Sequence, residues 1–361
     1  MEVESLADFD RRLAAGARSL SGWHVQGLDL RDRTDSLHAV DVGGALFLEC
    51  VLSPGDEIEV RARGAVVYAR IPPGPDVPAV PPAPHVRHES ALYTARELYD
   101  TPDYADSLDA RIFAWSKRPR DRDSSLAQAL HDHDIDEALA AWEAGRSLVG
   151  VMGGHAMPRG SREYADAARL GHTLGGAHVV ATGGGPGAME AANLGAVLSG
   201  RPGDALEEAL QMLGRVPSYR PDVGAWMAAG FEVLDTVPEP VDTLGIPTWH
   251  YGHEPSNPFA TTIAKYFGNA TREATLLEVC RGGIIFLPGA GGTVQEIFQD
   301  ACENYYADES SLAPMVLVGR EHWTETLPAW PLLTSLAQGR PMADHIHLAD
   351  TLEEAAALVG A

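Results

Sequence analysis

The chain has few cysteines, and their spacing excludes the commonest structural uses of this residue. Cys50, Cys280 and Cys302 are its three cysteines, and none belongs to a CxxC pair. A disulfide scaffold or a thiolate zinc site would need more cysteines at closer, regular spacings. We therefore expect unpaired thiols in a reducing compartment and predict a cytoplasmic location.

Basic residues and long apolar runs are also scarce. Lys and Arg number 27 against 51 Asp and Glu, which gives a formal net charge of −24 at pH 7. A surface of this sign repels nucleic-acid backbones and anionic membranes, so we expect neither as a partner. No apolar run approaches the roughly 18 residues that a transmembrane helix requires. The acidic start, Met1–Ser5, lacks the regions of a signal peptide.

Glycine and proline are abundant, and their distribution divides the chain. Of 361 residues, 37 are Gly and 25 are Pro, and residues 72–87 are rich in proline, which is typical of a stiff linker. Before it, an amphipathic helix and short β-type runs in residues 1–71 predict a small β-rich N-terminal module. After it, apolar spacing in residues 88–145 predicts a helical connecting segment, and residues 146–361 alternate between strand and helix patterns.

This alternation predicts the fold class, a Rossmann-like, doubly wound α/β domain over residues 146–361. Strands that alternate with helices form a parallel sheet with right-handed crossovers. Near the end of the chain we expect a long helix over residues 258–279, a buried strand from residue 284, and a helix that begins at Thr293. Ligands of such sheets bind at the carboxyl ends of the strands, where the strand order reverses.

The stretch Ile284–Phe298 is the most informative in the chain. Its apolar run ends at Pro288, and a turn with three glycines around Ala290 precedes the helix. The backbone N–H groups of such a turn and the helix N-terminus together suit an anion such as a phosphate. The segment from Thr293 to Glu296 also matches a capping box, in which Thr293 caps the helix and Glu296 reaches back to it. Both roles stay open at this point.

Two further glycine turns follow earlier strands of the same region. Gly153-Gly154 follows the strand at residues 147–152, and Gly183–Gly187 follows the strand at residues 177–182. The second turn fits G-x-G-x-x-A, a dinucleotide pattern. That pattern normally lies in the first turn and is followed about 20 residues later by an acidic residue, which is missing here. Such glycines also serve close packing of helix against strand, so packing and nucleotide binding both remain open.

Together the three turns resemble those of the LOG ("lonely guy") family. Its members are Rossmann-like nucleoside 5′-monophosphate phosphoribohydrolases, often mislabelled lysine decarboxylases. The family pattern P-G-G-x-G-T-x-x-E is matched from Pro288 to Glu296, except that Ala290 replaces the second glycine. The resemblance covers about residues 146–361. It implies a hydrolase that cleaves the N-glycosidic bond of a nucleoside 5′-monophosphate into free base and ribose 5-phosphate.

The resemblance also implies the site residues. Glu296 would stabilise oxocarbenium character at the sugar and orient water, since a carboxylate near C1′ favours this charge. Arg272, on the helix before the strand, would hold the phosphate or position Glu296, although Glu273 follows it where the family has lysine. The residues expected to bind the phosphate and nucleotide are Gly153, Gly154, Gly183, Gly184, Gly185, Gly187, Met189, Gly289, Ala290, Gly291, Gly292 and Thr293.

The expected ligand is an AMP-like nucleoside 5′-monophosphate, with no cofactor and no metal. Because LOG-like proteins form dimers, we expect a homodimer or a higher even-numbered assembly, built through the helices that flank the Gly183 turn. Molybdenum-cofactor carrier proteins resemble the chain through the same turns but are much shorter. A non-catalytic carrier or a nucleotide sensor is therefore the alternative, and Arg272 discriminates, because only a hydrolase needs it at Glu296.

Two polar or aromatic segments have competing interpretations. His131–Glu137 contains two histidines and four acidic residues, but the histidines stand two apart, whereas helical zinc pairs stand four apart. We therefore expect a solvated polar turn and not a metal cluster. Trp249–His253 follows a predicted strand near the expected pocket, where an aromatic ring could stack on a base or simply pack against the strand.

Overall fold

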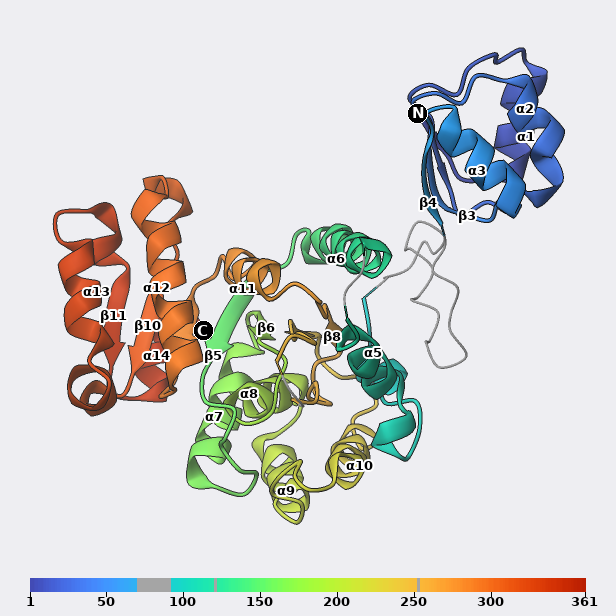
Figure 1. Cartoon of the computed structure of the whole chain (residues 1–361). Coiled ribbons are helices and arrows are strands. Elements are labelled where there is room, and N and C mark those ends of the chain that lie inside the picture. The colour runs from blue at the N-terminus through green and yellow to red at the C-terminus, as the bar shows by residue number, and fades with distance from the viewer. Residues whose placement is uncertain (70–91, 120–121, 252–253) are drawn as a thin grey trace. The chain divides into compact units, whose positions relative to one another are not determined.

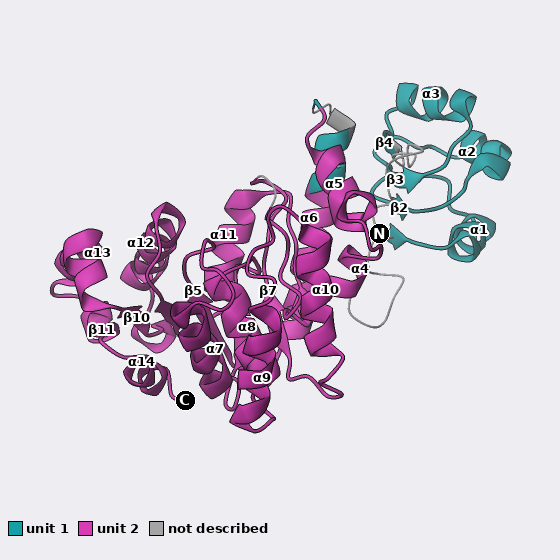
Figure 2. Cartoon of the chain, turned by 90° about the horizontal axis from the view of Figure 1, so that it is seen from below, with its two compact units in different colours: residues 1–79, 119–128 teal, residues 80–118, 129–361 magenta. Residues whose placement is uncertain are grey.

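The computed structural model describes residues 1–69, 92–119, 122–251 and 254–361 (Figure 1). The chain divides into two compact units, shown in Figure 2. Unit 1 comprises residues 1–79 and 119–128, and unit 2 comprises residues 80–118 and 129–361. The proline-rich linker predicted at residues 72–87 lies outside the described residues. None of the helices in the described ranges is long and apolar enough to cross a membrane.

Unit 1 is a small parallel α/β module. Its four-stranded sheet follows chain order, and a helix precedes each new strand. Glu2, His24, Leu46 and Val66 are in register, so the strands recur after 22, 22 and 20 residues. The expected sheet is present, together with two helices, α2 and α3, that the sequence did not indicate. The elements are β1 (Glu2–Val3), α1 (Leu6–Ala14), β2 (His24–Gln26), α2 (Thr34–Ala39), β3 (Leu46–Cys50), α3 (Pro54–Ala62) and β4 (Val66–Ala69).

Three glycines mark the repeat of this module. Gly22, Gly44 and Gly64 each stand two residues before a strand and have φ values of 74°, 75° and 90°. These left-handed values favour glycine over residues with a Cβ. The N–H of Gly22 donates to the Gly44 carbonyl, and that of Gly44 to the Gly64 carbonyl, both at 3.0 Å. The successive repeats of unit 1 are therefore hydrogen-bonded to one another at these glycines. The module has its own hydrophobic core, which includes Phe9, Trp23, Val25, Phe47 and Val67.

Unit 2 contains the predicted Rossmann-like sheet. Its seven strands are all parallel and lie in the order β11-β10-β9-β5-β6-β7-β8. Chain order runs outward in one direction from β5 and in the other from β9, so the switch point lies between these two strands. The strands are β5 (Leu148–Met152), β6 (Val179–Thr182), β7 (Thr243–Gly245), β8 (Thr262–Ile263), β9 (Ile284–Phe286), β10 (Met315–Val318) and β11 (Ile346–Ala349).

Helices cover both faces of this sheet. Right-handed crossovers place helices on opposite faces when the chain moves in opposite directions across the sheet. Consistently, α7, α8 and α14 belong to one layer, because α7 contacts both of the others. In the second layer α12 contacts both α11 and α13. The helices are α7 (Arg162–Leu174), α8 (Ala188–Val197), α11 (Asn269–Glu278), α12 (Gly291–Tyr306), α13 (Ala329–Ala337) and α14 (Leu352–Leu358).

The long helix predicted over residues 258–279 is wrong. The described chain instead forms the short edge strand β8 and an irregular connection, and only the last ten residues before Val279 form α11. Thr243 and Thr261 exchange hydrogen bonds beside this strand, including one of 3.0 Å from the Thr261 hydroxyl to the Thr243 carbonyl. The edge pairing thus competes successfully with helix formation. Before β7 the chain adds two further helices, α9 (Gly203–Leu213) and α10 (Val223–Leu234).

The helical segment carries α4 (Ala95–Leu98), α5 (Leu108–Ser116) and α6 (Arg122–Glu143). A buried ion pair attaches α5 to the connection before α11, with Lys265 Nζ 2.6 Å from Asp109 Oδ1. The solvated turn predicted at residues 131–137 is wrong, because these residues lie within α6 and His131 is buried. Asp132 accepts hydrogen bonds from the N–H groups of residues 267 and 268, at 2.9 and 2.7 Å, and so fixes the start of α11.

Candidate functional site

The three glycine turns meet at the carboxyl ends of β5, β6 and β9. A Cβ added to Gly153 would lie 3.0 Å from the Cβ of Ala188 and 3.1 Å from that of Leu287. The Ala188 N–H donates to the Gly154 carbonyl at 3.1 Å, and the Leu287 N–H donates to the Met152 carbonyl at 2.8 Å. The turn after β5 therefore contacts the turns on both sides of it. This is the edge of the sheet at which ligands bind in Rossmann-like folds.

The turn after β9 begins a helix earlier than the sequence pattern suggests. Helix α12 starts at Gly291, and its N-cap residue, Ala290, provides no side-chain cap. The capping-box interpretation is therefore wrong, because Thr293 lies within the first helical turn, where it is 5% exposed. Its Cβ would lie 2.7 Å from a Cβ added to Gly289. His322 Nε2 donates to the Gly289 carbonyl at 3.0 Å and holds the turn from outside.

This turn is open toward solvent. Gly291 and Gly292 are exposed, and Gly289 is half-buried. A Cβ added to Gly291 or Gly292 would meet no described atom within 4 Å. The first N–H groups of a helix have no partner within the helix, and the helix dipole adds partial positive charge there. The geometry thus suits one anionic group bound by backbone N–H groups.

The turn after β6 is buried and already satisfied. Gly183–Gly187 are all buried. The Gly184 N–H donates to the Thr182 hydroxyl at 3.0 Å, while the Asn257 side chain donates to the Gly185 carbonyl at 3.2 Å. The Met189 side chain covers the turn, since its sulfur would lie 2.9 Å from a Cβ added to Gly183. These glycines therefore permit close packing around the turn.

Glu296 lies on α12, one turn after the open glycines, and is half-buried. Burial raises the pKa of its carboxyl group to about 8, the Arg272 charge opposes that rise, and the Glu273 charge adds to it. A carboxyl group with this pKa is mostly protonated at neutral pH, so it can both donate and accept a proton there. Titratable groups shifted in this way are typical of functional sites.

Arg272 lies on α11 and is only 9% exposed. Its Nη1 donates to Glu273 Oε2 at 2.7 Å. Its Nη2 would lie 3.7 Å from a Cβ added to Gly183, which shows that the guanidinium reaches the turn after β6. Its Nε is buried and has no hydrogen-bond partner among the described residues. Arg272 is near enough for its charge to lower the pKa of Glu296, but its close ionic partner is Glu273.

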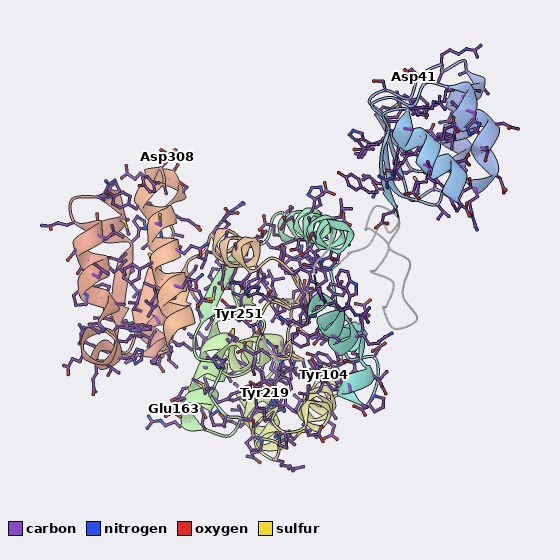
Figure 3. The ribbon with its side chains drawn as sticks, viewed as in Figure 1. Asp41, Tyr104, Glu163, Tyr219, Tyr251 and Asp308 are labelled. Carbon is purple, nitrogen blue, oxygen red and sulfur yellow. The ribbon has the colours of Figure 1, made fainter. Side chains whose placement is uncertain are left out.

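Further residues beside this site were not identified from the sequence. Asn269 Nδ2 donates to the Tyr251 hydroxyl at 3.1 Å and lies 3.4 Å from Glu273 Oε1. Tyr251 is 47% exposed and is labelled in Figure 3. Glu254 would lie 3.8 Å from a Cβ added to Gly185, and its Oε1 is 3.7 Å from His155 Nε2. The aromatic segment at residues 249–253 was the available signal for Tyr251, whereas Asn269 and Glu254 carry no motif.

Trp249 packs in the interior and has no free face for a base. It is 2% exposed, and its ring centroid lies 4.7 Å from that of Phe267. Its Nε1 donates to Asp109 Oδ1 at 2.9 Å. Trp249 is therefore not available to stack on a base, and within the segment at residues 249–253 only another residue could do so. Of these, residues 252 and 253 lie outside the described part of the chain.

Fold and site together define a Rossmann-like α/β protein with an open, anion-type turn at its switch point. No protein-family model matches the chain, and no curated protein matches it significantly. Among solved structures, the chain is similar to the molybdenum cofactor binding protein from the phototrophic bacterium Rippkaea orientalis. The alignment has 18% identity and a TM-score of 0.37, and it covers 59% of this chain and 95% of that protein.

Two further solved structures give the same picture. The molybdenum cofactor carrier protein from Chlamydomonas reinhardtii aligns with 18% identity and a TM-score of 0.37, covering 59% of this chain and 96% of its own. The structural genomics target TM1055 aligns with 17% identity and a TM-score of 0.35, covering 59% of this chain and 98% of its own.

Proposed function

We propose that the protein is a nucleotide N-glycosidase that hydrolyses a nucleoside 5′-monophosphate into free base and ribose 5-phosphate. One observation carries this proposal. A carboxyl group whose pKa is raised to about 8, Glu296, stands one helical turn after an open, glycine-rich anion site. A 5′-phosphate on that turn brings the attached ribose toward Glu296. The resemblance of the three turns to the LOG family supports the same reaction.

In the proposed reaction, water forms a bond to C1′ while the bond from C1′ to the base nitrogen breaks. The ionised fraction of Glu296, which grows as the pH approaches 8, stabilises the positive charge that develops on the sugar and accepts a proton from the attacking water, and the departing base takes up a proton from solvent. Arg272 has an unpartnered, buried Nε within the described structure. It therefore has a hydrogen bond available for the substrate in addition to its bond to Glu273.

The second candidate is a non-catalytic nucleotide or molybdenum-cofactor binder, acting as a carrier or a sensor. One observation favours it, namely that Arg272 pairs with Glu273 and not with Glu296. A binder needs the open turn but no activated carboxyl group. It would bind its ligand and release it unchanged, so product analysis separates the two candidates.

The decisive experiment incubates the full chain with a panel of nucleoside monophosphates and measures free base by chromatography. We expect base release from at least one of them by the unaltered protein. Glu296→Gln should reduce it by at least 100-fold and leave nucleotide binding within about threefold, because it keeps shape and removes the charge. Glu303→Gln is the matched control, since Glu303 lies on the same helix and burial also raises its pKa, to about 7.

Equal activity of Glu296→Gln and the unaltered protein would contradict the proposed catalytic role of Glu296. Binding of a monophosphate without release of any base, by a correctly folded protein, would support the carrier or sensor instead. The Glu303→Gln control distinguishes loss of a reacting group from a general disturbance of α12.

Assembly and location remain part of the proposal. We propose a homodimer, but α8 cannot form its interface as expected, because nine of its ten residues, all except Met189, are buried within the chain itself. Of the two helices that flank the Gly183 turn region, only α7 has exposed positions for a partner. The three free cysteines agree with a reducing, cytoplasmic location.

A further inference from the structure

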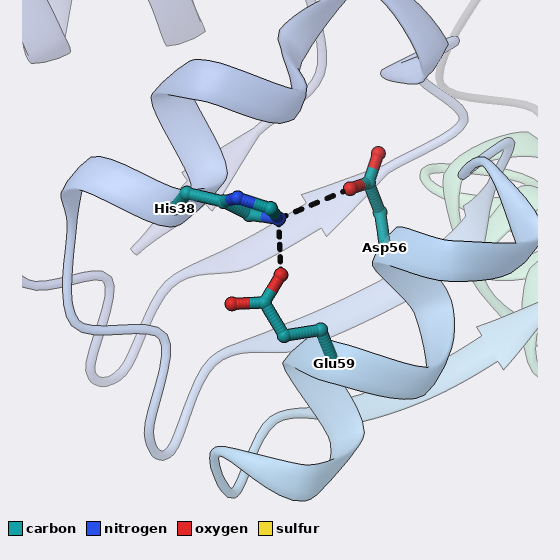
Figure 4. Close-up of side chains that lie close together, drawn as sticks. All are labelled: His38, Asp56 and Glu59. Atoms are coloured by element: carbon teal, nitrogen blue, oxygen red, sulfur yellow. Dashed lines mark ion pairs between the residues drawn. The ribbon is translucent and has the colours of Figure 1, made fainter.

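Unit 1 contains a group of three metal-binding types of side chain that the proposed hydrolysis does not use. His38 comes from the last turn of α2, and Asp56 and Glu59 come from α3 (Figure 4). One potential ligand atom from each residue lies within 4.8 Å of the others. Among the residues that the structure describes, this is the one group of at least three His, Cys, Asp or Glu side chains with such a geometry.

Two carboxylate oxygens face one imidazole nitrogen in this group. His38 Nε2 lies 3.3 Å from Asp56 Oδ1 and also pairs closely with Glu59 Oε2. A ring nitrogen carries at most one hydrogen, so it can donate well to only one of these two oxygens. Two carboxylate oxygens and one imidazole nitrogen that converge on one point are, by contrast, suitable ligands for a cation placed between them.

Neighbouring side chains hold both carboxylates in place. The Thr34 hydroxyl donates to Asp56 Oδ2 at 2.6 Å. Arg63 Nη1 donates to Glu59 Oε1 at 3.2 Å. In each carboxylate the second oxygen is thus bound by the protein, while the first faces His38. Supporting hydrogen bonds of this kind are characteristic of metal ligands, because they fix the orientation of the group.

Burial adds a reason for a cation at this place. The Asp56 side chain is 4% exposed, whereas those of His38 and Glu59 are 46% and 38% exposed. An ionised, buried carboxylate needs a positive partner. The more exposed His38 and Glu59 leave one side of the group accessible, so an ion could enter and water could complete its coordination.

We propose that His38, Asp56 and Glu59 bind one divalent transition-metal ion, such as Zn²⁺, that joins α2 to α3. One nitrogen and two oxygen ligands favour zinc or a similar metal over calcium and magnesium, which prefer oxygen ligands alone. Bond lengths of about 2.1 Å place tetrahedral ligand atoms about 3.4 Å apart, so the closely paired His38 and Glu59 atoms would have to separate, which rotation of these two exposed side chains allows. The ion would be a structural clip, independent of the site in unit 2.

The test uses the full, untagged chain after treatment with a chelator. Calorimetric titration with Zn²⁺ should show one site per chain with a micromolar Kd, and Ca²⁺ at the same concentrations should show none. His38→Ala should abolish this site. Glu59→Gln, which retains the volume of the side chain, should weaken it by at least tenfold. Circular dichroism of each variant checks that the module remains folded.

Two control variants exclude general binding by an acidic surface. His24→Ala removes an exposed histidine of the same module. His133→Ala removes an exposed histidine of unit 2, on α6, whose Nε2 lies 3.6 Å from Glu137 Oε1. Neither should change the Zn²⁺ site. Unchanged binding by folded His38→Ala and Glu59→Gln, or the absence of a stoichiometric Zn²⁺ site, would overturn the proposal.

Discussion

Glu296 is held in a position that is unfavourable for its charge. Its surroundings raise the pKa of the carboxyl group from 4.5 to about 8, mainly through burial. The folded state therefore binds a proton that the unfolded state releases between these two pH values. By linkage, the stability of the protein falls as the pH rises from about 4.5 to 8, because the folded state then binds more protons than the unfolded state.

Removing this charge should therefore stabilise the protein, and only at higher pH. We expect Glu296→Gln to match the unaltered protein near pH 4.5 and to exceed it at pH 8.5 by on the order of 2 kcal/mol, allowing for partial exposure of the side chain. Thermal unfolding of both proteins at several pH values measures the difference. An equal or lower melting temperature of Glu296→Gln at pH 8.5 would mean that the charged form is not destabilised by its surroundings.

At the same residue scale, the sequence indicated candidate residues but not their partners. The strand, glycine turn and helix pattern led to Glu296 as a candidate, and the family resemblance led to Arg272. It could not indicate that Arg272 would pair with its neighbour Glu273, because that depends on rotamers chosen in a buried setting. Asn269 was missed, and Tyr251 was considered only within the Trp249–His253 segment, because the hydrogen bond between them joins residues 18 positions apart without a motif.

The glycines of the turns differ in what a side chain would meet, and the difference is testable. Gly289→Ala would bring its Cβ to 2.7 Å from the Cβ of Thr293, whose side chain is buried. Relief requires a backbone shift, so we expect a loss of about 1–3 kcal/mol in unfolding free energy. Gly291→Ala, with open space around the new Cβ, is the matched control and should cost less than about 0.5 kcal/mol. Chemical denaturation measures both.

The same comparison tests the turn as a binding element. A displaced Gly289 would misdirect the N–H groups at the start of α12, so Gly289→Ala should also weaken binding of AMP. If Gly289→Ala unfolds at the same denaturant concentration as Gly291→Ala, the close contact with Thr293 is not maintained in solution.

At the element scale, the long central strands and their turns were predictable, because apolar runs bounded by glycine are a strong local signal. The edges were not. The start of α12 was placed two residues late, since the Gly291-Gly292 pair has a low helix propensity and only the tertiary fold makes it helical. In unit 1 the repeat was missed because each copy offers only a glycine and a strand as short as two residues.

Among the described residues, the molecule combines an open, glycine-rich turn that suits an anion with a strongly acidic chain. The turn after β9 leaves its N–H groups accessible, whereas the turn after β6 is buried and Gly184 uses its N–H within the chain. A second phosphate therefore has no comparable site among the described turns. The net charge of −24 adds repulsion against every further negative charge on a ligand.

We therefore expect the protein to bind a nucleoside 5′-monophosphate at least about tenfold more tightly than the corresponding triphosphate, the free nucleoside or NAD. The monophosphate gains the bonds of the turn that the nucleoside lacks, and it avoids the repulsion that the triphosphate meets. Calorimetry with AMP, ATP, adenosine and NAD, and with the other monophosphates, measures this order. Arg272→Ala serves as the control for phosphate recognition, because it should weaken AMP and leave adenosine unchanged. Tighter binding of ATP or NAD than of every monophosphate would contradict both the ligand class and the proposed hydrolysis.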